Sequence, residues 1–256
     1  MTQTNTNCKI IVITSGKGGV GKTTTTANIG AGLAMKGYKV ALIDTDTGLR
    51  NLDLLLGLEN RIMYDLVDVT SGKIPYKKAL VRHKKYETLF LLPTSQTKDK
   101  LAVSPEQVVA LCSEMSADFD FILIDCPAGI EQGFKTAVAA ADIALVVTMP
   151  EISAVRDADK IIGELNRADK ENILLIVNRI RPDMVAKGEM LDLDDINDIL
   201  AIKCIGQIPD DEMVVSSTNR GEPVIANTKS QAGIAYQNIT RRLCGCLLYT
   251  SPSPRD

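Results

Sequence analysis

One segment of the chain has the residue types and spacing of a phosphate-binding loop. Residues 16–23, Gly-Lys-Gly-Gly-Val-Gly-Lys-Thr, match the pattern G-x-x-x-x-G-K-[ST]. The glycines let backbone N–H groups point at phosphate oxygens, Lys22 has the reach to contact the terminal phosphates, and the Thr23 hydroxyl is suited to Mg²⁺. We therefore predict a site for ATP and Mg²⁺. The residues expected to bind the nucleotide here are Gly16, Lys17, Gly18, Gly19, Val20, Gly21, Lys22, Thr23 and Thr24.

The loop stands between a predicted strand and a predicted helix, as phosphate binding requires. An apolar run at 9–14 predicts the strand, and residues 23–36 predict a helix that Gly37 ends. The N-terminal end of a helix has unpaired N–H groups and partial positive charge, so it favours an anion. A glycine-rich tight turn without a ligand is the alternative, and the full match in this context makes it the weaker one.

Three aspartates follow predicted strands. Asp44 and Asp46 come after a strand at 39–43, and Asp125 ends another apolar strand. Ligands of open α/β sheets bind at the carboxyl ends of strands, and a hard cation takes oxygen ligands. We expect Thr23, Asp44 and Asp125 to hold the metal and Asp46 to orient the attacking water, although Asp44 and Asp46 could exchange these roles. Each aspartate alone would more often be a turn residue or a helix cap, and it is their order after the loop and their places at strand ends that favour the metal site.

Short aliphatic runs alternate with stretches of helical periodicity along the chain. This alternation predicts an α/β fold, doubly wound, with a mostly parallel sheet and helices on both faces. The later predicted strands are 89–92, 121–124, 143–148, 173–177 and 204–208. The later predicted helices are 105–115, 132–140, 155–168, 194–200 and 231–243. No linker rich in Gly, Ser or Pro divides the chain, so residues 1–246 are predicted to form one domain.

The composition is that of an ordinary globular chain with an aliphatic core. The 256 residues are 45% hydrophobic and 24% charged, with 4% aromatics and no Trp, and Val, Ile and Leu typically build parallel sheets. The net charge of −3 argues weakly against a protein that works mainly on nucleic acid. No apolar run is 18 residues long, so no membrane-spanning helix is predicted.

The cysteines and the single histidine restrict the chemistry further. Six cysteines lack C-x-x-C spacing, and the polar residues 1–7 do not resemble a signal peptide, so we expect a cytoplasmic protein with free thiols. His83 is the only histidine, which makes a zinc site or a Ser-His-Asp triad hard to build. We expect His83 to be a surface residue in the basic run 82–85.

Lys17 distinguishes the loop from the plain phosphate-binding pattern. The form G-K-G-G-x-G-K-[ST] resembles the deviant Walker A branch of P-loop ATPases, the MinD/ParA family. In that family the additional lysine reaches the ATP of the partner subunit. The resemblance therefore implies an ATP-dependent homodimer, and it adds Lys17 to the candidate catalytic residues Lys22, Asp44 and Asp46. A solvated loop lysine is the alternative for Lys17.

Further segments narrow the resemblance to the MinD branch. They are residues 46–53 (Asp-Thr-Gly-Leu-Arg-Asn-Leu-Asp), 92–100 (Leu-Pro-Thr-Ser-Gln-Thr-Lys-Asp-Lys), 125–131, 150–159 and 219–224. The similarity runs from about residue 9 to residue 245. The residues it implies on the adenine side are Asn178, Arg179 and Pro209. Those it implies at the dimer and partner surface are Glu151, Ser153 and Asp157, for which an ordinary helix start with acidic residues is an equal alternative.

The resemblance implies a regulator of bacterial division-site placement. ATP would drive dimerisation, and the dimer would bind the inner face of the cell membrane. There it would recruit the division inhibitor MinC and meet an activator such as MinE. Hydrolysis would then return the monomer. The expected location is therefore cytoplasmic and peripheral on the membrane, and no nucleic acid is expected as a partner.

Other functions remain open within the same superfamily. A ParA-type DNA-partition or flagellar-number ATPase shares the loop, but DNA binding requires a basic surface. A metal-cluster carrier requires cysteines that bridge a dimer, whereas Cys126 alone fits a small core residue. A scaffold that binds nucleotide with negligible hydrolysis would have no need of Asp46 and Asp125.

The last ten residues do not fit the resemblance. MinD proteins end in an amphipathic membrane helix, whereas residues 247–256 contain Ser-Pro-Ser-Pro and have no apolar face. We expect a disordered, non-native tail, with a genuine variant end as the alternative. The membrane anchor is consequently expected of the natural protein and doubtful in this polypeptide.

Overall fold

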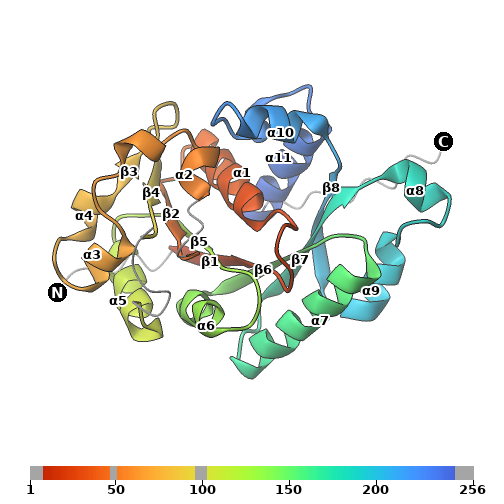
Figure 1. Cartoon of the computed structure of the whole chain (residues 1–256), viewed down its shortest axis with the longest axis horizontal. Helices are drawn as coiled ribbons and strands as arrows, with labels where there is room; N and C mark the ends of the chain where they lie inside the picture. Colours follow the sequence, from red (N-terminus) through yellow and green to blue (C-terminus); the bar gives the residue numbers. More distant parts are fainter. Residues whose placement is uncertain (1–7, 47–50, 96–102, 246–256) are drawn as a thin grey trace.

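The computed structural model describes residues 8–46, 51–95 and 103–245, which form an α/β structure around one eight-stranded sheet (Figure 1). The strand order is β3-β4-β2-β5-β1-β6-β7-β8, and every neighbouring pair is parallel except β3 and β4. The strands are β1 Lys9–Thr14, β2 Val40–Asp44, β3 Val81–Arg82, β4 Leu89–Leu92, β5 Phe121–Asp125, β6 Ile143–Thr148, β7 Ile173–Ile180 and β8 Lys203–Pro209. The predicted fold class is confirmed.

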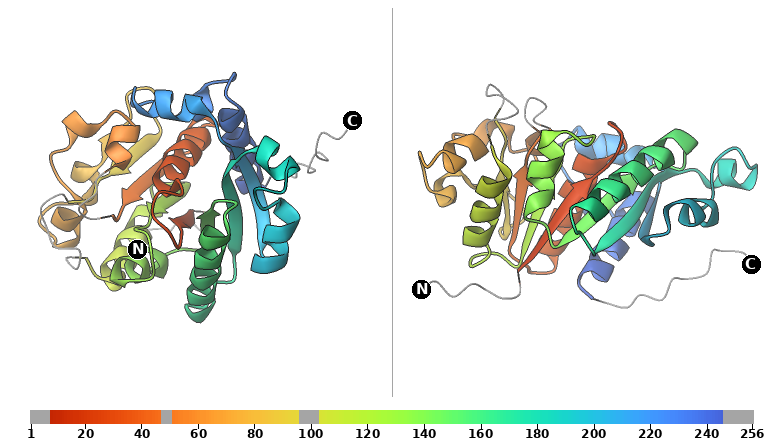
Figure 2. Two further views of the ribbon diagram at one scale, coloured as in Figure 1. Left: turned by 45° about the vertical axis from the view of Figure 1, so that its right-hand side comes forward. Right: turned by 90° about the horizontal axis from the view of Figure 1, so that it is seen from below.

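Helices cover both faces of the sheet (Figures 1 and 2). The longer ones are α1 Lys22–Met35, α5 Pro105–Met115, α6 Gln132–Ala139, α7 Ile152–Arg167, α9 Leu193–Leu200 and α11 Gln231–Leu243. The shorter ones are α2 Leu52–Leu55, η1 Glu59–Arg61, α3 Leu66–Thr70, α4 Tyr76–Ala79, α8 Pro182–Ala186, α10 Glu212–Thr218 and η2 Val224–Ala226. Helices α1 and α11 lie on one face, and α5, α6, α7 and α9 lie on the other.

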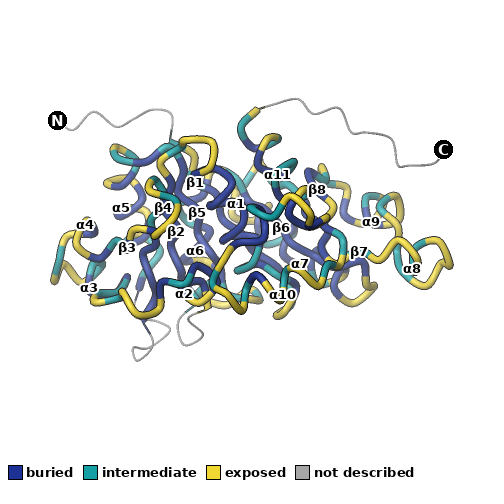
Figure 3. Tube along the Cα trace, turned by 90° about the horizontal axis from the view of Figure 1, so that it is seen from above, coloured by how far each residue is buried: buried dark blue, intermediate teal, exposed yellow. Residues whose placement is uncertain are grey.

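The alternation of side chains along the strands creates two hydrophobic cores. In β1, Ile11 and Ile13 pack with α1 and α11, while Val12 between them packs with the helices of the opposite face. All three side chains are fully buried. A parallel sheet covered on both faces needs such continuous aliphatic strands, and Figure 3 shows the strands as the buried interior of the chain.

Most element boundaries agree with the pattern-based prediction within a few residues. Helix α1 begins at Lys22, one residue earlier than predicted, and Gly37 follows it with φ of 89°. Helix α7 begins at Ile152 instead of residue 155, with Glu151 at its N-cap position. The short elements β3, α2, α3, α4, α8 and α10 were not predicted, since each is too short to show a clear period.

His83 is buried, so the expectation of a surface histidine was wrong. Its side chain is 7% exposed and stacks on Tyr86, with ring centroids 4.9 Å apart. Its Nδ1 accepts the backbone N–H groups of Lys85 and Tyr86, both at 3.1 Å. The ring therefore closes the turn between β3 and β4. Burial, together with Lys85, Lys84 and Arg61, lowers the pKa of His83 to about 4.

Some expectations fall outside the described residues. They concern the middle of segment 46–53, residues 96–100 and the tail 247–256. Among the helices that the structure describes, none has the length and apolar character needed to cross a membrane.

Candidate nucleotide-binding site

The phosphate loop joins β1 to α1, and two of its glycines have left-handed backbone conformations. Gly19 has φ of 80° and Gly21 has φ of 99°, values that other residues rarely adopt. Gly21 is the N-cap of α1, so the first N–H groups of the helix lie at the loop. A Cβ at Gly16 would lie 2.2 Å from the backbone oxygen of Asp157, so glycine allows the loop to approach α7.

Lys22 is a buried lysine whose ammonium group is positioned by the residue before the loop. The side chain is 8% exposed, and Nζ donates to the Ser15 hydroxyl at 3.0 Å. That hydroxyl donates to the Lys17 carbonyl oxygen at 2.8 Å. A buried ammonium needs such partners, and its other N–H groups are suited to phosphate oxygens. The Lys22 ammonium is therefore held at the loop by Ser15, and its contact with phosphate stays a prediction.

Asp125 ends β5 and contacts two threonines of α1. The Thr26 hydroxyl donates to Asp125 Oδ1 at 3.1 Å, and Thr23 also forms a side-chain hydrogen bond with the carboxylate. Thr45 donates to the Asp125 carbonyl oxygen at 2.6 Å. Burial raises the pKa of Asp125 to about 6, and the Thr23 hydrogen bond and the charge of Lys22 oppose this shift. The predicted metal residues Thr23 and Asp125 are therefore in contact.

Asp44 is a second buried carboxylate beside Asp125. The two residues pair in register on β2 and β5, and each is 1% exposed. Burial, and then the charge of Asp125, raises the pKa of Asp44 well above its usual range, while a hydrogen bond from the Asp46 N–H at 3.0 Å opposes the shift. Two crowded carboxylates near the Thr23 hydroxyl form a hard-oxygen donor set, which fits Mg²⁺.

These donors suit a metal that also binds phosphate and water. Within the described ranges, no group of three or more His, Cys, Asp and Glu side chains is arranged to hold a metal ion. Mg²⁺ typically takes only one or two carboxylates and keeps waters and substrate phosphates as its other ligands. The donor set at the loop is of this kind.

The residues expected around adenine lie at the ends of β7 and β8. Asn178 is 6% exposed, and its Nδ2 donates to the Val20 carbonyl oxygen at 2.7 Å. Its Oδ1 accepts the Arg179 N–H at 3.0 Å, and Arg179 has a left-handed φ of 56°. Pro209 ends β8, opposite Ile180 of β7. Asn178 thus contacts the phosphate loop, whereas Arg179 and Pro209 lie at the neighbouring strand ends.

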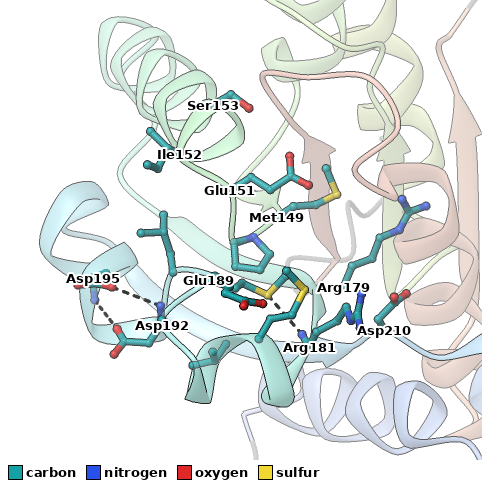
Figure 4. A pocket seen from close by; sticks show the side chains of 16 residues that line it. Met149, Glu151, Ile152, Ser153, Arg179, Arg181, Glu189, Asp192, Asp195 and Asp210 are labelled. Atoms are coloured by element: carbon teal, nitrogen blue, oxygen red, sulfur yellow. Dashed lines mark hydrogen bonds between the residues drawn. The ribbon is translucent and has the colours of Figure 1, made fainter.

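A cavity of about 800 Å³ adjoins these strand ends (Figure 4). Glu151 and Ser153 contribute to its wall from the start of α7, and Arg179 and Arg181 from the end of β7 and the residue after it. Asp210, directly after β8, also lines the cavity. The cavity therefore lies between the predicted adenine side and the predicted dimer surface.

Lys17 contacts the start of α7 in its own chain. Its Nζ lies 3.7 Å from Glu151 Oε2 and donates to the Ser153 hydroxyl at 3.5 Å. Asp157, one turn further along, forms an ion pair with Lys160 at 3.0 Å. The three residues expected at the dimer and partner surface thus lie on the stretch of α7 that borders the loop.

Two residues of the site were not identified from the sequence. Ser15 positions Lys22, and Thr26 hydrogen-bonds Asp125. The spacing of Thr26 from Thr23 is a usable signal, because residues three apart on a helix share a face. For Ser15, the corresponding signal was a serine directly after a strand and directly before the phosphate loop.

Comparison with known proteins gives the family. The CobQ/CobB/MinD/ParA nucleotide binding domain matches residues 11–224. The septum site-determining protein MinD of Bacillus subtilis (strain 168) is 54% identical over 239 residues, which cover 92% of this chain and 88% of that protein. The chain belongs to the MinD family.

Solved structures agree with the sequence relatives. MinD in the MinC:MinD cell division protein complex of Aquifex aeolicus is 50% identical, with a TM-score of 0.88 over 96% of this chain and 99% of that one. MinD of Pyrococcus horikoshii OT3, solved with Mg-ADP, is 29% identical, with a TM-score of 0.82 over 92% and 96%. MinD family members are P-loop ATPases, so the predicted enzyme class and family resemblance are confirmed.

Proposed function

We propose that this chain is a magnesium-dependent ATPase that dimerises with ATP and regulates placement of the division septum. One observation carries the nucleotide part of the proposal. Lys22, the first residue of α1, and Asp125 at the end of β5 are both buried, and Asp125 hydrogen-bonds Thr23 and interacts with the charge of Lys22, at the point where the loop presents its N–H groups. The proposed ATPase unit comprises residues 1–246, with residues 247–256 as a separate tail.

Each residue of the loop region has a role in this proposal. The backbone of residues 16–24 surrounds the phosphates, and Lys22 neutralises charge on the terminal ones. Asn178, Arg179 and Pro209 border the base. Thr23, Asp44 and Asp125 would hold Mg²⁺, which supplies positive charge to the phosphates when bound. Asp46, fixed against Asp44 by its N–H, orients the attacking water.

The homodimer is the part of the proposal that depends on Lys17. The lysine lies at the edge of the loop with 42% of its side chain exposed, which leaves it accessible to a second copy of the chain. In the dimer, Lys17 would contact the phosphates held by the partner subunit. Because only a γ-phosphate places this charge between the subunits, ATP and not ADP would favour association.

The division inhibitor MinC is the proposed protein partner. The Aquifex aeolicus MinD that is 50% identical to this chain was solved in a MinC:MinD cell division protein complex. An activator such as MinE and the inner face of the cell membrane are further proposed partners. A peripheral position on the membrane is consistent with the absence of a spanning helix from the described part of the chain.

One experiment distinguishes this function from DNA partition. Binding of purified MinC, of anionic lipid vesicles and of a nonspecific DNA duplex would be measured with Mg-ATP and with Mg-ADP. We expect MinC to bind with Mg-ATP only. DNA binding that depends on ATP, without MinC binding, would favour the ParA-type alternative instead. Vesicle binding tests the membrane role separately from MinC binding.

Lys22→Ala provides the nucleotide control for the same experiment. Removal of a charge-assisted contact to phosphate should weaken Mg-ATP binding by about tenfold or more, as measured by calorimetry. Lys36→Ala is the matched control, because Lys36 is exposed at the other end of the same helix. Unchanged ATP binding by Lys22→Ala would contradict the assignment of the loop.

A further inference from the structure

We propose that Asn178 is a positioning residue for the phosphates, acting through the Gly21 N–H of the loop. This inference rests on the proposed function, since it assumes that the loop binds phosphate. Asn178 is expected to lie beside adenine, and this inference gives the same residue a second role at the phosphates. The hydrogen bond from Asn178 Nδ2 to the Val20 carbonyl oxygen, 2.7 Å long and buried, connects positions 158 residues apart in the chain.

The direction of this hydrogen bond determines the orientation of one peptide group. The Val20 carbonyl and the Gly21 N–H belong to the same planar trans peptide, so they point in opposite directions. With the carbonyl oxygen turned toward Asn178, the Gly21 N–H points away from β7. As the N-cap residue of α1, Gly21 lies where unpaired N–H groups of a helix bind anions.

The amide of Asn178 is itself fixed. Its Oδ1 accepts the Arg179 N–H at 3.0 Å, which leaves Nδ2 to face Val20. Val177, the preceding residue, pairs with Thr148 of β6 and with Gln207 of β8. Asn178 therefore directly follows a residue that is paired on both sides, and it lies where the pairing of β7 with β8 becomes irregular, between Val177 and Ile180.

Two backbone conformations accommodate the contact. A Cβ at Gly21 would lie 2.3 Å from Asn178 Nδ2, so the approach requires glycine at this position. Arg179 adopts a left-handed φ of 56°, a conformation that is strained for a residue with a Cβ. Such strain persists where the surroundings impose it, and it is concentrated at functional sites.

A change at Asn178 could weaken ATP binding in two ways. It could remove a contact with the adenine base, or it could disturb the phosphate loop. Inorganic tripolyphosphate separates them, because it has the phosphate chain and no base. If Asn178 acts through the loop, tripolyphosphate and ATP should lose affinity together. If Asn178 contacts only adenine, tripolyphosphate should bind as in the wild type.

The test uses calorimetric titration of Mg-tripolyphosphate and Mg-ATP into the full chain and two variants. Asn178→Leu keeps the shape of the side chain but removes the donor, and Asn178→Ser is too short to reach the Val20 oxygen. Asn172→Leu is the matched control, because Asn172 is an exposed asparagine directly before β7. Circular dichroism would establish that each variant is folded at the assay temperature.

We expect both Asn178 variants to bind the two ligands about tenfold more weakly, by equal factors, and Asn172→Leu to bind both normally. Normal tripolyphosphate binding with weakened ATP binding would overturn the inference, as would normal binding of both ligands by Asn178→Leu. If both Asn178 variants unfold, the inference is also overturned, because the Asn178 amide is then required for folding. Failure of the wild type to bind either ligand would instead contradict the proposed function.

Discussion

Lys17 and Glu151 form an ion pair within one chain, with Nζ 3.7 Å from Oε2. Lys17 is also the residue that is proposed to contact the partner subunit's phosphates. The same ammonium cannot remain at the start of its own α7 and reach across a dimer. The intrachain contact therefore competes with dimerisation, although both side chains are about half exposed and such pairs are weak.

Glu151→Gln should therefore make ATP-dependent dimerisation easier. Loss of an exposed ion pair corresponds to about a two- to fivefold lower ATP concentration at half-maximal dimer formation. Static light scattering during an ATP titration measures this concentration. Glu164→Gln, which removes a carboxylate that pairs with Arg167 further along α7, should leave it unchanged. A higher ATP requirement in Glu151→Gln would show that Glu151 supports the dimer instead.

Gly16 and Gly18 form a matched pair for testing how closely the loop packs on α7. A Cβ at Gly16 would lie 2.2 Å from the Asp157 backbone oxygen, whereas a Cβ at Gly18 meets nothing within 4 Å. Overpacking against backbone typically costs about 1–3 kcal/mol, so Gly16→Ala should lower the thermal unfolding midpoint by roughly 3–10 °C. Gly18→Ala should change the midpoint little. Equal midpoints for the two variants would argue against the close contact with Asp157.

His83 should make the folded state less stable in mild acid. Its pKa is about 4 when folded, against 6.5 for an ordinary histidine, so the unfolded chain binds the additional proton first as pH falls. The stability contributed by neutral His83 is complete above about pH 6.5 and is lost as the pH falls toward 4. With solvent screening of the partly buried ring taken into account, the expected loss at pH 4 is about 1–3 kcal/mol.

Two measurements check the role of His83. As the only histidine, it gives one set of imidazole NMR signals, which should not titrate above pH 5. His83→Asn keeps an acceptor near Nδ1 and cannot titrate, so urea unfolding should show a weaker pH dependence than in the wild type between pH 6.5 and 4. Titration of the imidazole near pH 6.5 would be incompatible with the buried ring.

The phosphate loop and the strand-end carboxylates were predictable because their signals are local. The motif fixes the order of glycines, Lys22 and Thr23, and Asp44 and Asp125 directly follow apolar runs. Parallel strands then bring these ends to one edge of the sheet. In the structure, Asp44 of β2 lies opposite Asp125 of β5.

The contacts between distant segments were not predictable from those signals. Asn178 donates a hydrogen bond to Val20, which lies 158 residues away in the chain, and no periodicity in the sequence indicates such a pair. His83 lies in a basic run that suggests exposure, yet its Nδ1 satisfies two backbone N–H groups of the turn and its ring stacks on Tyr86. A hydrogen bond between distant segments positions Asn178, whereas hydrogen bonds within a turn position His83.

Lys17→Ala tests most directly the claim that this P-loop site controls dimerisation. Size-exclusion chromatography with light scattering would measure the mass of wild type and variant with Mg-ATP and with Mg-ADP, and calorimetry would measure ATP binding. We predict a dimer of the wild type with Mg-ATP alone, and a monomeric Lys17→Ala that still binds ATP. A wild type that stays monomeric at saturating ATP, or a Lys17→Ala that dimerises normally, would contradict it.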